Sequence, residues 1–137
     1  MDRRGFLVGS AASLCALFSA APSFAGTYLY RASILIDGAD RESSLLRRRL
    51  FDKDLARVLH RVALSRVEAA SRMSVPPEVG KAHPHCLLVL EAFERAADAA
   101  VRGDNEGFLV SQSRARAELV TLVSVLKELG WELPKVS

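Results

Sequence analysis

Residue types that identify several common classes of protein are scarce in this sequence. Its two cysteines, Cys15 and Cys86, are too few for a disulfide scaffold, a four-cysteine zinc site or an iron–sulfur cluster built by this chain alone. Eight glycines and five prolines are too few for a collagen-like or low-complexity chain, and a hydrophobic content of 50% is too high for general disorder. The 137 residues therefore have the composition of an ordinary globular protein with one domain.

Motifs that identify many enzymes and cofactor proteins are also missing. The sequence has no phosphate-binding glycine loop and no Gly-x-Ser-x-Gly nucleophile elbow. It lacks the Cys-x-x-Cys-His motif of covalent haem attachment and the Glu-x-x-His motif of ferritin-like di-iron sites. The net charge of +3 is too small to indicate a nucleic-acid partner. We therefore expect no nucleic-acid partner and favour a protein that is not an enzyme, with a helical enzyme kept as the third hypothesis.

The first 25 residues have the layout of a cleavable export signal. A short charged start precedes a mostly apolar run over residues 6–21. Pro22 ends this run, and Ser23 and Ala25 place small residues at positions −3 and −1 of a cleavage site. Cleavage after Ala25 would separate a signal peptide, residues 1–25, from a mature domain, residues 26–137.

The charged start resembles the twin-arginine signal, in which two adjacent arginines, here Arg3 and Arg4, precede a bulky apolar pair. The resemblance implies export of the folded protein by a bacterium, to the periplasm or beyond. A general secretory signal is one alternative, and a retained anchor formed by the uncharged stretch 5–30 is another. A lipoprotein signal at Cys15 is disfavoured because the large Leu14 precedes it. We expect no permanent membrane span after cleavage.

The mature chain has four stretches with the apolar spacing of helices, near residues 29–50, 53–73, 84–102 and 105–129. Asp52 can cap the second stretch, and Pro84 suits the first turn of the third. Gly103 can end the third helix and Asp104 can cap the fourth, which leaves a connection short enough to make these helices antiparallel neighbours. The prediction is an all-α fold, a small antiparallel bundle of about four helices.

Residues 28–36 permit a second interpretation. Their apolar and other residues alternate up to Asp37-Gly38, as in a strand that enters a hairpin turn. No second strand is predicted elsewhere, and a single strand cannot satisfy its backbone hydrogen bonds. A helix is preferred, although Gly38 would cost it about 1 kcal/mol.

The apolar faces of these stretches predict the core. The fourth stretch carries a heptad seam whose one polar member is Gln112: Phe108, Gln112, Ala115, Leu119, Leu122, Leu126 and Leu129. The predicted inner face of the second stretch is Leu55, Val58, Leu59, Val62, Ala69 and Met73. The residues expected in the core are Leu59, Val62, Leu87, Leu90, Phe93, Phe108, Leu119, Leu122 and Leu126. Gly130 should end the last helix and let Trp131 fold back onto it.

The densest group of metal-ligating side chains is His83, His85 and Cys86, with His60 as the remaining histidine. Imidazole and thiolate suit zinc or copper, and a histidine inside a bundle can hold haem. No standard zinc spacing is present, so these residues also fit a helix start with a small buried cysteine. A metal- or haem-binding bundle that uses these four residues is the alternative function.

A group of arginines offers a second candidate site, for anions. Five of them lie near one another in sequence: Arg47, Arg48, Arg49, Arg57 and Arg61. Guanidinium groups can hold a phosphate, a carboxylate or an anionic lipid surface. Asp52 and Asp54 are interleaved with them, so a salt-bridged surface is the other interpretation.

The third stretch is apolar around most of its circumference, which predicts either a central helix or an interface. Cys86 has no partner in the mature chain, and an exported thiol must be buried, ligated or joined to another molecule. The leading hypothesis is therefore an exported, non-enzymatic helical bundle that binds a protein partner, a second copy of itself or a small ligand.

Overall fold

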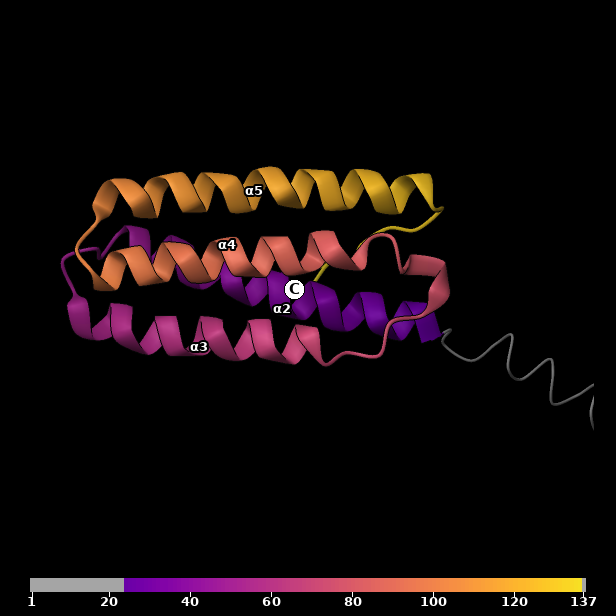
Figure 1. The fold of residues 1–137 in the computed structure, drawn as a ribbon, viewed down its shortest axis with the longest axis horizontal. Helices are drawn as coiled ribbons and strands as arrows, with labels where there is room; N and C mark the ends of the chain where they lie inside the picture. The colour runs from indigo at the N-terminus through magenta and orange to yellow at the C-terminus, as the bar shows by residue number, and fades with distance from the viewer. Residues whose placement is uncertain (1–23, 137) are drawn as a thin grey trace, which may run out of the picture.

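The structure is a computed structural model that describes residues 24–136, and these residues form four long helices (Figure 1). The helices are α2 (Phe24–Arg47), α3 (Lys53–Ser71), α4 (His83–Val101) and α5 (Asn105–Glu128), with a short 3-10 turn, η1 (Pro77–Val79), between α3 and α4. The all-α prediction is confirmed. The strand interpretation of residues 28–36 is wrong, because Tyr28, Leu29, Ala32 and Ile36 recur at helical spacing on one buried face.

The predicted signal lies almost entirely outside the described residues. Arg3, Arg4 and Cys15 fall within residues 1–23, which the structure does not describe. Ala25, the last residue of the predicted signal, lies in the first turn of α2 and is buried in the core.

The ends of the helices follow the predicted local signals. The side chain of Asp52 accepts a hydrogen bond from the Leu55 amide at 3.0 Å, which caps the start of α3. At the α4–α5 connection, Gly103 has a φ of 77°, and the Asp104 amide donates to the Ala99 carbonyl oxygen at 2.8 Å. The Asp104 side chain then accepts from the Gly107 amide at 2.8 Å and caps α5. One short segment thus ends one helix and starts the next in the opposite direction.

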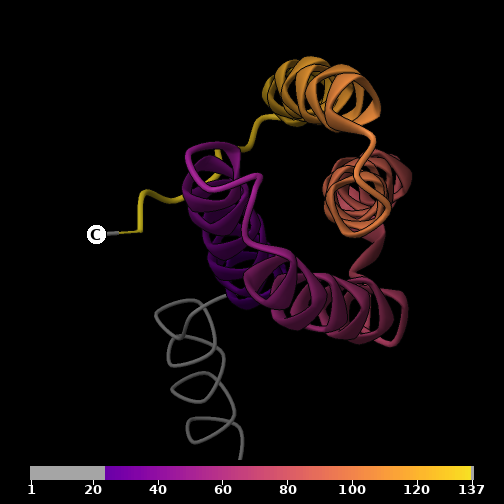
Figure 2. The same ribbon diagram turned by 90° about the vertical axis from the view of Figure 1, so that its left-hand side faces the viewer.

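The end of α5 is also formed by a glycine with positive φ. Gly130 has a φ of 88°, and the Trp131 amide donates to the Leu126 carbonyl oxygen at 2.8 Å. The indole packs against the core, as predicted. The segment from Glu132 to Val136 continues without helix and crosses towards α2 (Figure 2).

The four helices run up and down, with each one beside the next along the chain (Figures 1 and 2). α4 packs most extensively against α5 and α3, and it also contacts α2. Of the helices that lie side by side around the bundle, α2 and α5 pack least closely, so this side of the bundle is the most loosely packed. This side holds the candidate site.

The apolar circumference of α4 is explained by its central place. Its buried residues face three neighbouring helices: Cys86, Val89, Leu90, Ala92, Phe93, Ala96, Ala97, Ala99 and Ala100. The sequence allowed two explanations for this surface, a central helix or an interface, and the structure shows a central helix. The apolar surface of α4 therefore does not indicate a partner.

The predicted core is confirmed in part. Leu90, Phe93, Phe108, Leu122 and Leu126 are buried, and the other four predicted residues are partly buried. The inner face of α3 is rotated from the predicted one, since its buried residues are Ala56, Ala63 and Ala70 while Val58 is 50% exposed. Alanines at this seven-residue spacing let α3 approach its neighbours closely, and its larger side chains lie at the flanks of the contact.

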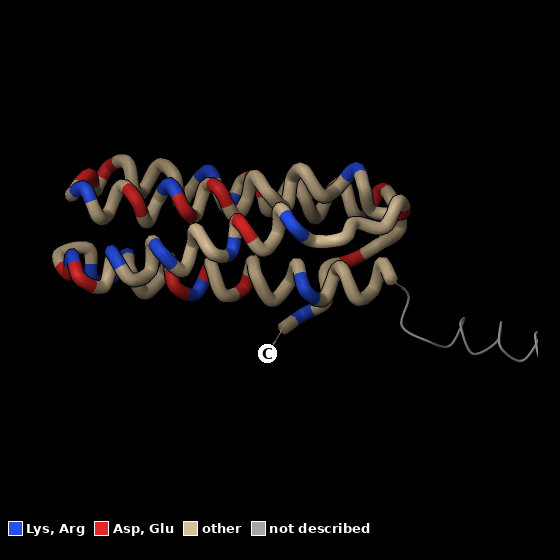
Figure 3. The backbone as a smooth tube through the Cα atoms, turned by 60° about the horizontal axis from the view of Figure 1, so that its bottom comes forward, with Lys and Arg blue, Asp and Glu red and all other residues tan. Residues whose placement is uncertain are grey.

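Charged residues of both signs are interspersed along the helices (Figure 3). They are most frequent towards the end of the bundle that holds the α2–α3 and α4–α5 connections, and neither sign forms a continuous patch there. Within residues 24–136, no helix is long and apolar enough to cross a membrane.

Candidate binding groove between α2 and α5

Polar side chains join α2 to α5 over the half of their contact nearest the α2–α3 connection. Gln112 is 1% exposed, and its Nε2 donates to the hydroxyl of Ser43 at 2.8 Å. Nη1 of Arg47 donates to the other amide atom, Oε1, at 3.3 Å. Gln112, the polar member of the heptad seam, therefore forms hydrogen bonds between helices and does not weaken the seam as an unpaired polar residue would.

A second pair lies beside it at the surface. Nη2 of Arg116 donates to Asp40 Oδ1 and to the Ser44 hydroxyl, both at 3.2 Å. These contacts tie the two helices together without close backbone packing. Towards the start of α2 and the end of α5, no side-chain hydrogen bond joins the described residues of the two helices.

A groove of about 370 Å³ occupies this remaining part of the α2–α5 contact. Three segments form its walls, namely α2, α5 and the C-terminal tail, and the lining residues are Ser33, Ile36, Asp37, Asp40, Leu119, Val123, Leu133, Pro134, Lys135 and Val136. The volume is in the range of sites for small ligands, and the lining is mostly apolar with a few polar groups. We refer to it as the α2–α5 groove.

Ser33 is the unusual polar group in this groove. Its side chain is 5% exposed, and its hydroxyl has no hydrogen-bond partner among the described residues. A buried hydroxyl without a partner costs about 1–3 kcal/mol. A ligand that places a hydrogen-bonding atom at Ser33 would remove this penalty.

The two carboxylates on the rim already have partners. Asp37 forms an ion pair with Arg41, and Asp40 forms one with Arg116. The groove therefore combines apolar side chains, the buried hydroxyl of Ser33 and two carboxylates that are neutralised by their own neighbours. It also includes Lys135, which has no ion pair among the described residues. This arrangement is suited to binding.

The four predicted metal ligands are placed in three different environments. The Tyr28 hydroxyl lies 2.6 Å from His83 Nδ1, and the two rings meet edge to face. Cys86 is buried in the same part of the core as Tyr28, and burial raises the pKa of the Cys86 thiol to about 11. Burial lowers the pKa of His83. His85 contacts a different helix, since its Nδ1 lies 3.9 Å from Oε1 of Glu118 on α5.

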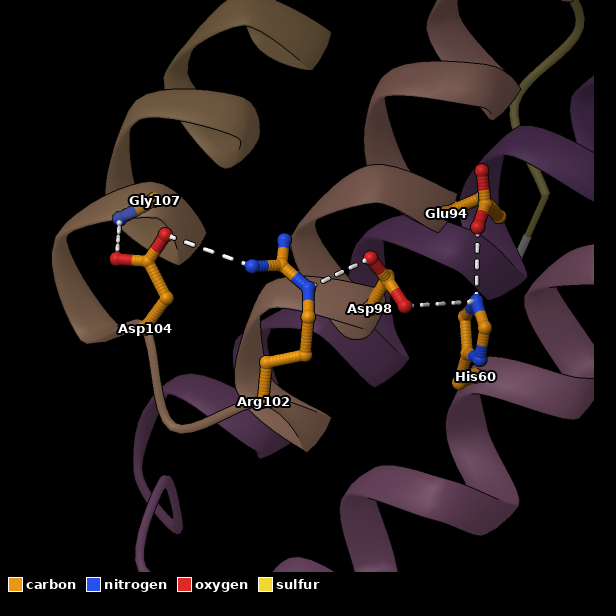
Figure 4. Close-up of polar contacts among 6 residues, drawn as sticks. All are labelled: His60, Glu94, Asp98, Arg102, Asp104 and Gly107. Carbon is orange, nitrogen blue, oxygen red and sulfur yellow. Dashed lines mark hydrogen bonds and ion pairs between the residues drawn. The ribbon is translucent and has the colours of Figure 1, made fainter.

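His60 is part of a separate polar chain between α3 and α4 (Figure 4). Its Nε2 lies 2.7 Å from Glu94 Oε2 and 3.9 Å from Asp98 Oδ1. Asp98 also accepts from Arg102 at 3.0 Å. This chain leads from the middle of α3 to the α4–α5 connection, so the carboxylates of α4 serve as partners for neighbouring side chains.

No three histidine, cysteine, aspartate or glutamate side chains within residues 24–136 lie close enough together to hold a metal ion. The structure therefore does not bring His60, His83, His85 and Cys86 into one ligand set. Binding of zinc, copper or haem stays a prediction from the sequence.

Three of the predicted anion-binding arginines are engaged within the protein. Arg47 contacts Gln112, Arg49 pairs with Asp52 at 3.1 Å, and Arg57 pairs with Asp54 at 2.8 Å. The remaining two, Arg48 and Arg61, are exposed. The interpretation as a salt-bridged surface accounts for most of the group, and anion binding stays a prediction.

Sequence analysis missed Ser33 and the tail, and it gave Gly38 no role. Ser33 interrupts the apolar face of α2, as Gln112 interrupts that of α5. This interruption was the feature of the sequence from which a buried polar group at Ser33 could have been predicted. Nothing in the sequence indicated that α2 and α5 would stand apart. Comparison with known proteins adds nothing, because no family model, curated protein or solved structure matches the chain.

Proposed function

We propose that this chain is an exported, non-catalytic helical bundle that binds a small ligand in the α2–α5 groove. The observation that carries the proposal is the buried hydroxyl of Ser33, without a partner, in the wall of a groove of about 370 Å³. The resemblance of residues 2–7 to a twin-arginine signal supports export. A small ligand is favoured over a protein partner because the apolar surface of α4 is covered by the bundle itself.

Binding of the neutral dye Nile red, whose fluorescence rises in apolar surroundings, tests the site. Val123 lines the groove and is 47% exposed, so Val123→Phe should fill the groove without disturbing the core. Val120→Phe on the same helix is the matched control, because Val120 is 70% exposed and does not line the groove.

We expect Val123→Phe to weaken dye binding about tenfold or more and Val120→Phe to leave it unchanged. Far-ultraviolet circular dichroism checks that both variants keep their helices. Equal binding by the wild type and both variants would place the dye elsewhere and overturn the proposal.

A further inference from the structure

The side of α5 that faces away from its buried seam carries an uncharged stripe. A second heptad pattern runs along this side, two positions out of step with the seam and therefore about 200° away around the helix. Its five middle positions are all exposed, and they are Val110, Ser113, Ala117, Val120 and Ser124. The outward face of a surface helix normally carries charged and polar residues, whereas Val110 is 63% exposed and Val120 is 70% exposed. We refer to these five residues as the outer stripe.

The outer stripe contains a shallow hollow of the kind that receives a side chain from a facing helix. Its lining residues are Leu109, Val110, Ser113, Arg114 and Ala117. The last four stand at positions i, i+3, i+4 and i+7, which is the arrangement of a hole in knobs-into-holes packing. Arg114 pairs with Glu118 on the same helix at 3.7 Å, so the charge at the edge of the hollow has a partner. The hollow is therefore suited to an apolar side chain.

The two ends of the stripe carry opposite charges. Glu106 and Lys127 occupy the next positions of the same heptad pattern, both are exposed, and neither forms an ion pair within residues 24–136. Two copies of α5 that lie antiparallel can place Glu106 of each opposite Lys127 of the other. Ser113 is seven residues after Glu106 and Val120 is seven residues before Lys127, so this register also places Val120 of one copy at the hollow of the other. Two-fold symmetry repeats both contacts.

We infer that the outer stripe of α5 is the interface of a homodimer in which two copies pack α5 against α5 in antiparallel orientation. A second copy is the occupant that fits, because one register pairs the charges at both ends and fills both hollows. An interface of one helix from each copy is small, and small interfaces belong to reversible complexes. We therefore expect a dissociation constant in the micromolar range. No residue of the hollow lines the α2–α5 groove, so the inference does not depend on the proposed function.

Sedimentation velocity of the full chain under reductant, from micromolar to millimolar concentration, tests the dimer. We expect a monomer–dimer equilibrium in the wild type. Val120→Lys should weaken it about a hundredfold or more, because it puts an ammonium group beside Arg114 in each hollow. Val58→Lys on α3 is the matched control, since Val58 is 50% exposed and lies on another helix, and it should leave the equilibrium unchanged. Far-ultraviolet circular dichroism checks that both variants keep their helices.

Two outcomes of this experiment would overturn the dimer. A monomer at every concentration would exclude a second copy and leave the stripe to a partner of another sequence. Dimerisation that survives Val120→Lys would assign the association to residues outside the stripe.

Reversal of the end charges tests the antiparallel register. Glu106→Lys and Lys127→Glu should each weaken the dimer about tenfold, because each places like charges together at both ends of the interface. An equimolar mixture of the two variants should regain the strength of the wild type, since the mixed dimer again pairs opposite charges at both ends. An effect on the folding of either chain would not be rescued by mixing. Unchanged dimerisation in both variants, or a mixture that stays weak, would overturn the register.

Discussion

At the scale of single residues, a buried amide replaces apolar packing between α2 and α5, two neighbouring helices that pack loosely. Gln112 donates to Ser43 and accepts from Arg47, so one side chain joins three positions across the α2–α5 contact. In a low-dielectric interior such a group is favourable when its hydrogen bonds are made and unfavourable when they are broken.

Replacing this amide should therefore destabilise the protein by more than a surface change does. We expect Gln112→Ala to lower the free energy of unfolding by about 1–3 kcal/mol, because it leaves the Ser43 hydroxyl without its donor. Ser113→Ala, at the next and exposed position, should change it by about 0.5 kcal/mol or less. Urea unfolding measures both, and equal effects would contradict the argument.

Cys86 provides a second prediction at this scale. Burial raises the pKa of its thiol to about 11, so the folded state prefers the protonated form. This contribution to stability is complete below the pKa of the unfolded chain, for which the reference value is 9.0, and is lost as the pH rises towards 11. Burial raises the pKa of Tyr28 as well, so both groups act in the same direction.

In a Cys15→Ser background, Cys86 should resist a thiol reagent near neutral pH until the protein unfolds, and unfolding midpoints should fall from pH 9 to pH 11. Replacing Cys86 by Ala should remove part of this alkaline loss. Rapid labelling of the folded protein would contradict the burial.

At the scale of the helices, α2 and α3 are joined by an ion pair whose arginine lies against a glycine. Arg66 binds both carboxylate oxygens of Glu42, at 2.5 and 2.6 Å. A Cβ at Gly38 would lie 2.7 Å from Arg66 Nη2, so the guanidinium group occupies the space that a larger residue would fill. A side chain at position 38 would therefore have to displace the end of the Arg66 side chain.

A double-mutant cycle tests this explanation. Alanine in place of a helical glycine normally stabilises a helix by about 1 kcal/mol. We expect Gly38→Ala to be neutral or destabilising in the wild type and to stabilise by about 1 kcal/mol in an Arg66→Ala background. The same stabilisation in both backgrounds would show that Arg66 does not depend on the glycine.

At the scale of the whole molecule, export and assembly are predicted from different parts of the chain. Export depends on Arg3 and Arg4, which lie outside the described residues. Twin-arginine transport requires the guanidinium pair rather than positive charge alone. We therefore expect the double variant Arg3→Lys, Arg4→Lys to remain in the cytoplasm, as measured by cell fractionation. Unchanged export would indicate a general secretory signal.

The burial of Cys86 makes a prediction about assembly. In a Cys15→Ser background the remaining thiol, Cys86, is buried and not available to join two chains, so the mass in solution should be the same with and without reductant. Light scattering measures this mass. A dimer that dissociates on reduction would contradict the buried position of Cys86.

The sequence alone determined the features that depend on neighbours along the chain. The capping side chains of Asp52 and Asp104, the turns at Gly103 and Gly130, and the heptad seam of α5 all lie where they were predicted. The caps and turns depend on contacts within about one turn of helix, and the residues that make them are adjacent in the sequence. The seam follows from the repeated spacing of apolar residues along α5. The all-α fold follows from the same local signals.

Only the tertiary structure decided which side chains meet across the bundle. It rotated α3 onto its alanine face, paired His60 with Glu94, and left α2 and α5 far enough apart for a groove. The rotation and spacing of a helix reflect the packing of all its neighbours at once, which no single stretch of sequence contains. Ser33 became a candidate binding residue for this reason, since its hydroxyl lacks a partner only in the assembled bundle.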